Sequence, residues 1–358
     1  MIVRHKPHRR EKQFEPFLFS CGVNTGGQLG LGNTVNTRIF TQVDEHRYIQ
    51  LATGNSASFA LRDDGLLFSW GYNYHGELGL GDLENRYVPT QVGSDRYVAI
   101  AANYNQAYAI RNDGLLFSWG RNNYGQLGLG DLENRYVPTQ VGSDRYITVA
   151  SGSYSLFAIR NDGLLFSCGV NNAYQLGLGD TVDRSIPTQV GSDRYITVNS
   201  GDGGGYAIRD DGLLFSWGYN GVGQLGLGDT VNRSIPTQVG NDRYKSVSSM
   251  VRHMIAVRED GVLLGCGIND YYQLGLGDTV NRNILTQMTD EKISMASAGS
   301  SDSSAITTNG KMLSCGRNFA GHLGFGDSKS RTILTRINND TYFDVSTGHT
   351  HSLCIKAA

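Results

Sequence analysis

The chain has 358 residues, among them 47 glycines and only six prolines, and a formal net charge of −2. Glycine is nearly twice as frequent as usual without a collagen period, which predicts a globular chain with many tight turns. No apolar run is long enough to span a membrane, no secretory signal follows Met1, and five cysteines do not suit a disulfide framework. We therefore expect an intracellular protein of the cytoplasm or nucleus, neither secreted nor bound to a membrane.

Residues 1–13 form the first predicted segment, a basic leader that we expect to be flexible. Its basic residues are Arg4, Lys6, Arg9, Arg10 and Lys12. A basic stub is also typical of localisation signals and of arms that touch nucleic acid, and these alternatives stay open. We expect residues 14–358 to form a single domain.

A tryptophan or cysteine followed by glycine recurs every 49 residues through the rest of the chain. The positions are Cys21, Trp70, Trp119, Cys168, Trp217, Cys266 and Cys315. Seven ungapped units of this length account for nearly everything after the leader. A fixed period of this size indicates a repeat architecture, so one unit predicts the whole fold.

Within one unit, "RYITVAS" (145–151) and "LFAIR" (156–160) are predicted strands, and "NDG" (161–163) is a hairpin turn into a third strand, "LLFSC". A long glycine-rich connection leads to a short fourth strand at "PTQV", and "GSDR" is predicted to turn into the next unit. Four antiparallel strands repeated seven times, without helical periodicity, predict an all-β, seven-bladed β-propeller.

The ring is predicted to close by mixing the two ends of the chain. The sequence begins mid-unit at "FLFSC" (17–21) and ends mid-unit at "FDVSTGHTHSLCI" (343–355). The last blade would therefore take two strands from each end.

The repeat resembles that of the regulator of chromosome condensation family. The pattern W-G-x-N-x-x-G-Q-L-G-x-G-D occurs at Trp119–Asp131 and Trp217–Asp229, and G-x-x-H-S occurs at Gly348–Ser352. The resemblance implies a seven-bladed propeller that serves as a circular interaction platform. Family members include nucleotide exchange factors for Ran-type GTPases that also bind nucleosomes, β-lactamase inhibitors and a plant photoreceptor. Gapless units leave no room for the exchange factor's inserted hairpin, and every tryptophan here occupies the structural W-G position.

Repetition argues against a chemical role for several motifs. An Asp and an Arg recur four residues apart in six units, as at Asp82 and Arg86, which predicts a pair that braces a loop, because an active site needs one copy. The first unit has Asn33 and Thr37 there and is predicted to be a looser blade. The cysteines share the tryptophan position and are predicted to be buried thiols.

Histidine offers the one candidate cluster. We expect His322, His349 and His351 to approach one another at the ring closure, where a metal or acid–base role is conceivable. The structural interpretation is stronger, because His351 fills the G-x-x-H-S position and no carboxylate is spaced to complete a site. No set of nucleophile, base and orienting group emerges, so we predict no catalytic residues, no metal, no cofactor and no enzymatic activity.

Differences between units locate a candidate site. The units at Trp70 and Trp119 differ at fourteen positions, all in the residues after the W-G pair or in the window from Val98 to Tyr108. In a four-stranded blade, the connections from first to second and third to fourth strand emerge on one side. Both windows should therefore share one face, here called the variable face, and the "GSDRY" and "NDG" turns should share the opposite, frozen face.

The variable face is rich in residue types that supply binding energy in protein interfaces. Its candidate contacts are Tyr72, Tyr74, His75, Tyr104, Arg121, Tyr124, Tyr154, Tyr174, Tyr219, Arg252, Tyr271, Tyr272, Arg317 and Phe319. Drift where packing imposes no constraint is the alternative explanation. The charges are mixed, which favours a protein partner over nucleic acid.

We thus predict a non-enzymatic propeller that binds a protein partner of unknown identity through this face. The alternatives are nucleotide exchange on a Ran-like small GTPase and association with chromatin or nucleic acid through the basic leader.

Overall fold

Strands are the only regular secondary structure in residues 16–357, the part of the chain that the computed structural model describes. The first twelve are β1 (Pro16–Gly22), β2 (Thr37–Gln42), β3 (Tyr48–Thr53), β4 (Ala57–Arg62), β5 (Leu66–Gly71), β6 (Arg86–Asn103), β7 (Gln106–Arg111), β8 (Leu115–Gly120), β9 (Arg135–Ser151), β10 (Ser155–Arg160), β11 (Leu164–Gly169) and β12 (Arg184–Ser200). The others are β13 (Gly204–Arg209), β14 (Leu213–Gly218), β15 (Arg233–Ser249), β16 (His253–Arg258), β17 (Leu263–Gly267), β18 (Arg282–Gln287), β19 (Ile293–Ala298), β20 (Asp302–Thr307), β21 (Met312–Gly316), β22 (Arg331–Arg336), β23 (Tyr342–Thr347) and β24 (His351–Ala357).

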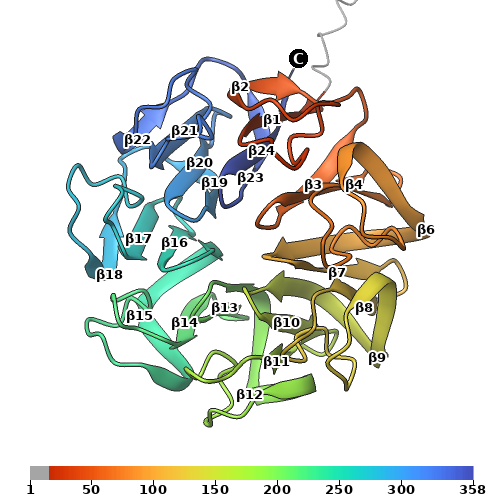
Figure 1. The fold of residues 1–358 in the computed structure, drawn as a ribbon. Coiled ribbons are helices and arrows are strands. Elements are labelled where there is room, and N and C mark those ends of the chain that lie inside the picture. The colour runs from red at the N-terminus through yellow and green to blue at the C-terminus, as the bar shows by residue number, and fades with distance from the viewer. Residues whose placement is uncertain (1–15, 358) are drawn as a thin grey trace, which may run out of the picture.

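The strands form seven antiparallel four-stranded blades around a central channel (Figure 1). Four long strands, β6, β9, β12 and β15, each serve as the outer strand of one blade and the inner strand of the next. The 24 strands of the described residues therefore fill 28 blade positions. The predicted seven-bladed propeller is confirmed.

The "GSDR" segment differs from the expected turn. In β6, β9 and β12, and in β15 where the segment reads "GNDR", it is a bend inside a continuous strand. In β6 the pairing with β5 jumps from Gln91 opposite Phe68 to Arg96 opposite Leu66. Gly93 is one of the extra residues, and its φ of 58° suits glycine. Backbone pairing resumes at once on both sides, so the strand continues into the next blade.

The ring closes as predicted. β1 and β2 from the N-terminal end join β23 and β24 from the C-terminal end in one sheet, with Phe19 opposite Cys354. Leu18 and Leu353 are fully buried there. These contacts join segments more than 300 residues apart in sequence, so closure rests on the last two strands.

The core lies between neighbouring blades. Phe59 and Trp119 come from adjacent blades, and their ring centroids lie 6.5 Å apart. The Trp119 indole also donates a 2.8 Å hydrogen bond to the Glu77 carbonyl of the preceding unit. Cys168, at the equivalent position, directs its thiol to the Gln126 carbonyl at 3.7 Å. The cysteines are buried and free as expected, and the thiol replaces the hydrogen-bond donor of the indole.

Ion pairs brace the repeated loops. The six predicted Asp–Arg pairs all form, with N–O distances of 2.5–3.0 Å. On the frozen face a second repeated network holds the hairpin turns, as where Arg111 contacts Asp113 at 2.8 Å and lies over the Phe117 ring at 4.9 Å. In the first unit, Asn33 still accepts a 3.1 Å hydrogen bond from Asn24.

A buried asparagine completes each loop brace. Asn122 is fully buried, accepts a 2.9 Å hydrogen bond from the Leu127 amide and donates to the Asp131 carbonyl at 3.0 Å. Equivalent asparagines are buried in all seven units. The family-like pattern W-G-x-N is thus a loop-stabilising motif, which explains why copying preserved it.

Candidate partner-binding face

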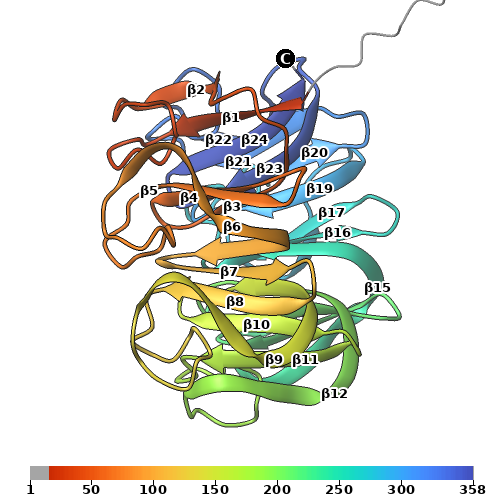
Figure 2. The ribbon, with the colours of Figure 1, turned by 90° about the vertical axis from the view of Figure 1, so that its right-hand side faces the viewer.

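The two variable windows share one face. Seen edge on, the long connections after β5 and β8 project to the left and the bends of β12 and β15 lie to the right (Figure 2). Contacts within the face join the two windows directly. The guanidinium carbon of Arg121, after β8, lies 5.7 Å from the ring centroid of Tyr154, in the β9–β10 turn.

Aromatic rings extend this contact into a cluster. Tyr154 lies 5.1 Å from Tyr104 and 5.3 Å from Tyr124, measured between ring centroids. On the neighbouring blade, Tyr72 and Tyr74 lie 5.3 Å apart. The structure therefore brings together three predicted tyrosines and one predicted arginine, with a separate pair of predicted tyrosines on the neighbouring blade.

Two further arginine–aromatic clusters lie around the same face. Arg252 lies 5.7 Å from the Tyr219 ring, and Arg317 lies 4.8 Å from Tyr271 and 4.5 Å from Phe319. Within residues 16–357, none of the three clustered arginines makes an ion pair with a carboxylate. Their guanidinium groups lie against rings, and the Nε of Arg121 is buried without a hydrogen-bond partner.

The first and second clusters are related by a swap. Arg121 and Tyr219 occupy one repeat position, while Tyr154 and Arg252 occupy another. The pair is Arg–Tyr in one place and Tyr–Arg two units later, and the distance is 5.7 Å in both. The same contact is therefore made with the two residues exchanged.

Three tyrosines of this face have a backbone that favours glycine. Tyr104, Tyr174 and Tyr272 have φ of 50°, 64° and 66°, and no other non-glycine residue in the described chain has a positive φ. Five other units hold glycine at the position of Tyr174 and Tyr272, with φ of 73–85°. A side chain there costs roughly 1–2 kcal/mol. Sequence reasoning singled out the tyrosines but missed the strain, which tyrosine in a glycine position could have revealed.

His75 is the remaining predicted residue. It is half-buried, and its amide donates a 2.7 Å hydrogen bond to Glu77. Burial and then Arg121 lower the pKa of His75, so the imidazole is neutral at pH 7.

Buried polar groups without partners gather beneath this face. Ten buried side-chain atoms of the described residues lack a hydrogen-bond partner, and all lie at this end of the strands. They belong to Gln106, Arg121, Gln126, Gln224, His253, Asp302, His322, His351 and Ser352. Most buried polar groups in proteins are satisfied, so this concentration sets the variable face apart from the frozen face.

Asp302 corrects one expectation. No carboxylate was expected near the clustered histidines, yet Asp302 Oδ1 lies 3.9 Å from His322 Nε2, with both side chains buried. Burial raises the pKa of Asp302 to about 8 and lowers that of His322 to about 4. Burial also lowers the pKa of His351 to about 3. Asp302, His322 and His351 are thus all uncharged at neutral pH.

The expected approach of the histidines is confirmed, because His322 and His349 both help to lower the pKa of His351. The contacts of His351 are those of a core residue, since its Nε2 lies 2.9 Å from the Ser58 hydroxyl of the next blade. His253 makes the same contact with Ser303 at 3.0 Å. In residues 16–357 no group of three or more His, Cys, Asp or Glu side chains is arranged to hold a metal ion.

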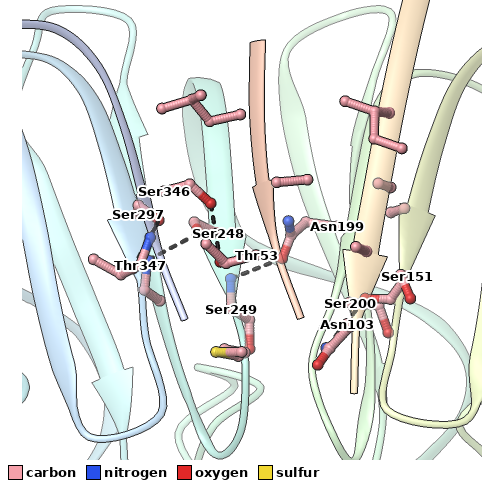
Figure 3. A pocket seen from close by; sticks show the side chains of 18 of the residues that line it. Thr53, Asn103, Ser151, Asn199, Ser200, Ser248, Ser249, Ser297, Ser346 and Thr347 are labelled. Carbon is pink, nitrogen blue, oxygen red and sulfur yellow. Dashed lines mark hydrogen bonds between the residues drawn. The ribbon is translucent and has the colours of Figure 1, made fainter. Parts of the chain in front are cut away.

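The central channel opens within this ring of turns. Small and polar side chains line its cavity of about 230 Å³, and no charged residue is among them. They join neighbouring blades (Figure 3), as where Thr53 bonds Ser346 at 3.0 Å and Ser297 bonds Thr347 at 2.8 Å. The channel therefore fixes the blades relative to one another and offers no charge to anchor a cofactor.

The predicted nucleic-acid contacts Arg4, Lys6, Arg9, Arg10 and Lys12 lie outside the described residues. Residues 16–357 contain no helix with the length and apolar character needed to cross a membrane.

The profile of the RCC1-like domain family matches residues 17–354. The chain belongs to this family. No curated protein sequence matches it. This RCC1-like chain is similar in structure to yeast RCC1 (Prp20) bound to Kap60, with a TM-score of 0.87 and 22% identity over 99% of this chain and 96% of that one.

A second structure of Prp20p, from Saccharomyces cerevisiae and described with its binding to Gsp1p and histones, has the same TM-score and identity over 97% and 92% of the two chains. Human WBSCR16 follows with a TM-score of 0.86 and 18% identity over 96% and 99%. At these identities the likeness shows the fold.

Proposed function

We propose that this RCC1-like propeller is a non-enzymatic interaction platform that binds a protein partner across its variable face. The strained tyrosines carry the proposal. Tyr174 and Tyr272 occupy a position where five units have glycine at a comparable positive φ. Selection for stability alone would be expected to remove residues that strain the backbone, so their presence favours selection for contact with a partner.

The composition of the face supports the same function. Tyrosine and arginine dominate interface hot spots, because they bury large area and can still form hydrogen bonds. Tyr74, Tyr124 and Phe319 are 68%, 41% and 52% exposed, although each is a large hydrophobic residue. Partner contact would bury them.

The test is a comparison of captured partners. The intact protein should recover a partner that a variant with Tyr72, Tyr124, Tyr219 and Tyr271 changed to Ala fails to recover. A matched control changes to Ala the residues Ile196 and Phe343, which are 54% and 50% exposed and directly follow inter-blade links on the frozen face. Equal recovery by the intact protein and the fourfold variant would contradict the face assignment.

A second candidate is nucleotide exchange on a Ran-like GTPase, favoured by the structural likeness to yeast RCC1. Against it, the strands of residues 16–357 are all used in the seven blades, which leaves no inserted hairpin there. Stopped-flow measurement of nucleotide release decides: acceleration of release from a small GTPase would replace the non-enzymatic proposal.

The basic leader carries a separate proposal. We propose that residues 1–13 are a flexible segment attached to a single propeller domain of residues 14–358, and that the leader supplies any association with nucleic acid in an intracellular setting. Salt-sensitive DNA binding should then vanish when residues 1–13 are deleted, because Lys and Arg release counterions from phosphates. Equal binding without the leader would contradict it.

A further inference from the structure

A small cup lies at the channel mouth on the variable face. Its volume is about 160 Å³, and six of its lining residues occupy one repeat position in six different units. These residues are Asn55, Tyr104, Ser153, Asp202, Val251 and His349. Six of the seven blades thus contribute the residue at one repeat position in the turn between their first and second strands. These six residues are of six different types.

Two further lining residues of the cup come from the preceding repeat position. Five units have glycine there, while Asn103 and Met250 are the exceptions and line both the cup and the channel. Backbone hydrogen bonds hold the wall, as where the Asn55 amide donates to the Tyr104 carbonyl at 3.0 Å and the Asp202 amide donates to the Val251 carbonyl at 3.2 Å. The cup is therefore part of the closed ring.

Asp202 is the acidic residue of this cup. The residue is exposed at the mouth of the cup, yet partial burial of its carboxyl among the neighbouring turns raises the pKa of Asp202 to about 6. The Ser153 hydroxyl donates a hydrogen bond to Oδ1. At pH 7 the group is mainly a carboxylate.

The other titratable groups near Asp202 leave this charge uncompensated by a direct pair. Arg252 lowers the pKa of Asp202, but it lies over the Tyr219 ring and makes no ion pair with Asp202 in the described chain. Burial lowers the pKa of His349, which is therefore neutral at pH 7. Tyr104 supplies an aromatic ring and Asn55 an amide, both suited to a cation.

We propose that this cup binds one basic side chain, a lysine or arginine that the protein partner inserts at the channel mouth, with Asp202 as its counter-ion. That a protein partner bears this side chain rests on the function proposed above. Asp202 would pair with the ammonium or guanidinium group, while Tyr104 and Met250 contact its aliphatic stem. A partner held at the axis in this way would make its other contacts with the surrounding aromatic clusters.

The chain offers a selective probe for the test. It has six methionines, of which Met250 lines the cup. In protein labelled with ¹³C at the methionine methyl groups, acetyl-Gly-Lys-Gly-amide and acetyl-Gly-Arg-Gly-amide should give a saturable shift of the Met250 signal, assigned with Met250→Leu. The norleucine and glutamate peptides of the same length should not. No shift with either basic peptide, or an equal shift with norleucine, would overturn the proposal.

Two variants tie the effect to Asp202. Asp202→Asn should weaken peptide binding at least tenfold, whereas Asp193→Asn, on the frozen face, should leave it unchanged. Binding to the intact protein should also fall as the pH is lowered through about 6, because protonation removes the counter-ion. Unchanged binding by Asp202→Asn would refute the assignment of this residue.

Partner capture separates this proposal from the wider one. If the aromatic variant loses the partner and Asp202→Asn keeps it fully, the protein-binding function stands and the inserted side chain is refuted. If the peptides shift Met250 but the aromatic variant captures partners as well as the intact protein, the cup stands and the function of the aromatic face is refuted.

Discussion

The strain at Tyr174 gives a prediction in which stability and binding move in opposite directions. Its φ of 64° falls within the range where a side chain clashes with the local backbone, and Gly125 occupies the equivalent position with φ of 73°. Both Tyr174→Gly and Tyr174→Ala remove the ring, but only glycine removes the Cβ that causes the strain. The difference between the two variants therefore isolates the strain from the loss of ring packing.

The left-handed conformation costs a non-glycine residue roughly 1–2 kcal/mol, which glycine avoids. Glycine in turn loses about 0.5–1 kcal/mol of stability because it is more flexible in the unfolded chain. We expect Tyr174→Gly to be more stable than Tyr174→Ala by about 1 kcal/mol, and the two variants to bind the partner equally poorly. The same comparison at Tyr272 should add a similar amount.

Urea unfolding followed by tryptophan fluorescence measures the difference in the free energy of unfolding between the two variants. The dependence of this free energy on urea concentration should be the same in both, so a shift of the midpoint reports the difference in stability. The matched control is Gly125→Ala, which should destabilise the protein because it introduces the left-handed strain and also places a Cβ 2.6 Å from the Ser185 Cα. Equal stability of Tyr174→Gly and Tyr174→Ala would refute the reasoning, and so would a stabilising Gly125→Ala.

Three other perturbations test the scaffold. Asp302→Asn should stabilise the protein at pH 7 by up to ~4 kcal/mol. The pKa of Asp302 is about 8 in the folded protein against 3.8 in the unfolded chain, so the stability of the intact protein falls as the pH rises between these values. The gain should vanish near pH 4, and a gain that does not depend on pH would contradict the burial argument. Asn122→Ala should cost about 2–3 kcal/mol in urea unfolding because it leaves the Leu127 amide without a partner, while its exposed neighbour Asn123→Ala should be neutral. Truncation after Tyr342 removes β24 and nearly all of β23, so the single cooperative transition should be lost; an unchanged melting curve would refute closure by the chain ends.

The period of the sequence made most of the fold predictable. Once the W-G pairs fix the unit, the turn at "NDG", the alternating strands and the two half-units at the chain ends follow from local rules, and they lead to one closed ring. The bend at Gly93 was harder to foresee. "GSDR" has the composition of a turn, and only the pairing of β5 on both sides of it shows that the strand continues.

The face on which the candidate residues gather was predictable, and the contacts among those residues were less so. Counting strands placed both variable windows on one face, because that result depends only on blade topology. The contact between Asp302 and His322 was missed, since twenty residues and a strand separate them and no spacing rule applies. Comparison of all seven units position by position would have found Asp302, whose counterparts include His253 and His351. The same comparison reveals the tyrosines in glycine positions.

The swapped pairs bear on whether the variable face is selected or merely free to drift. Drift changes positions independently, so an arginine gained at one repeat position need not meet an aromatic ring at another. Here Arg121 meets Tyr154, and two units later Tyr219 meets Arg252 with the residues exchanged and the same 5.7 Å separation. A requirement for the pair itself, whichever blade supplies the cation, accounts for both arrangements. The frozen stretch then has a simple role, because blades that pack identically allow the face to change one pair at a time without loss of the ring.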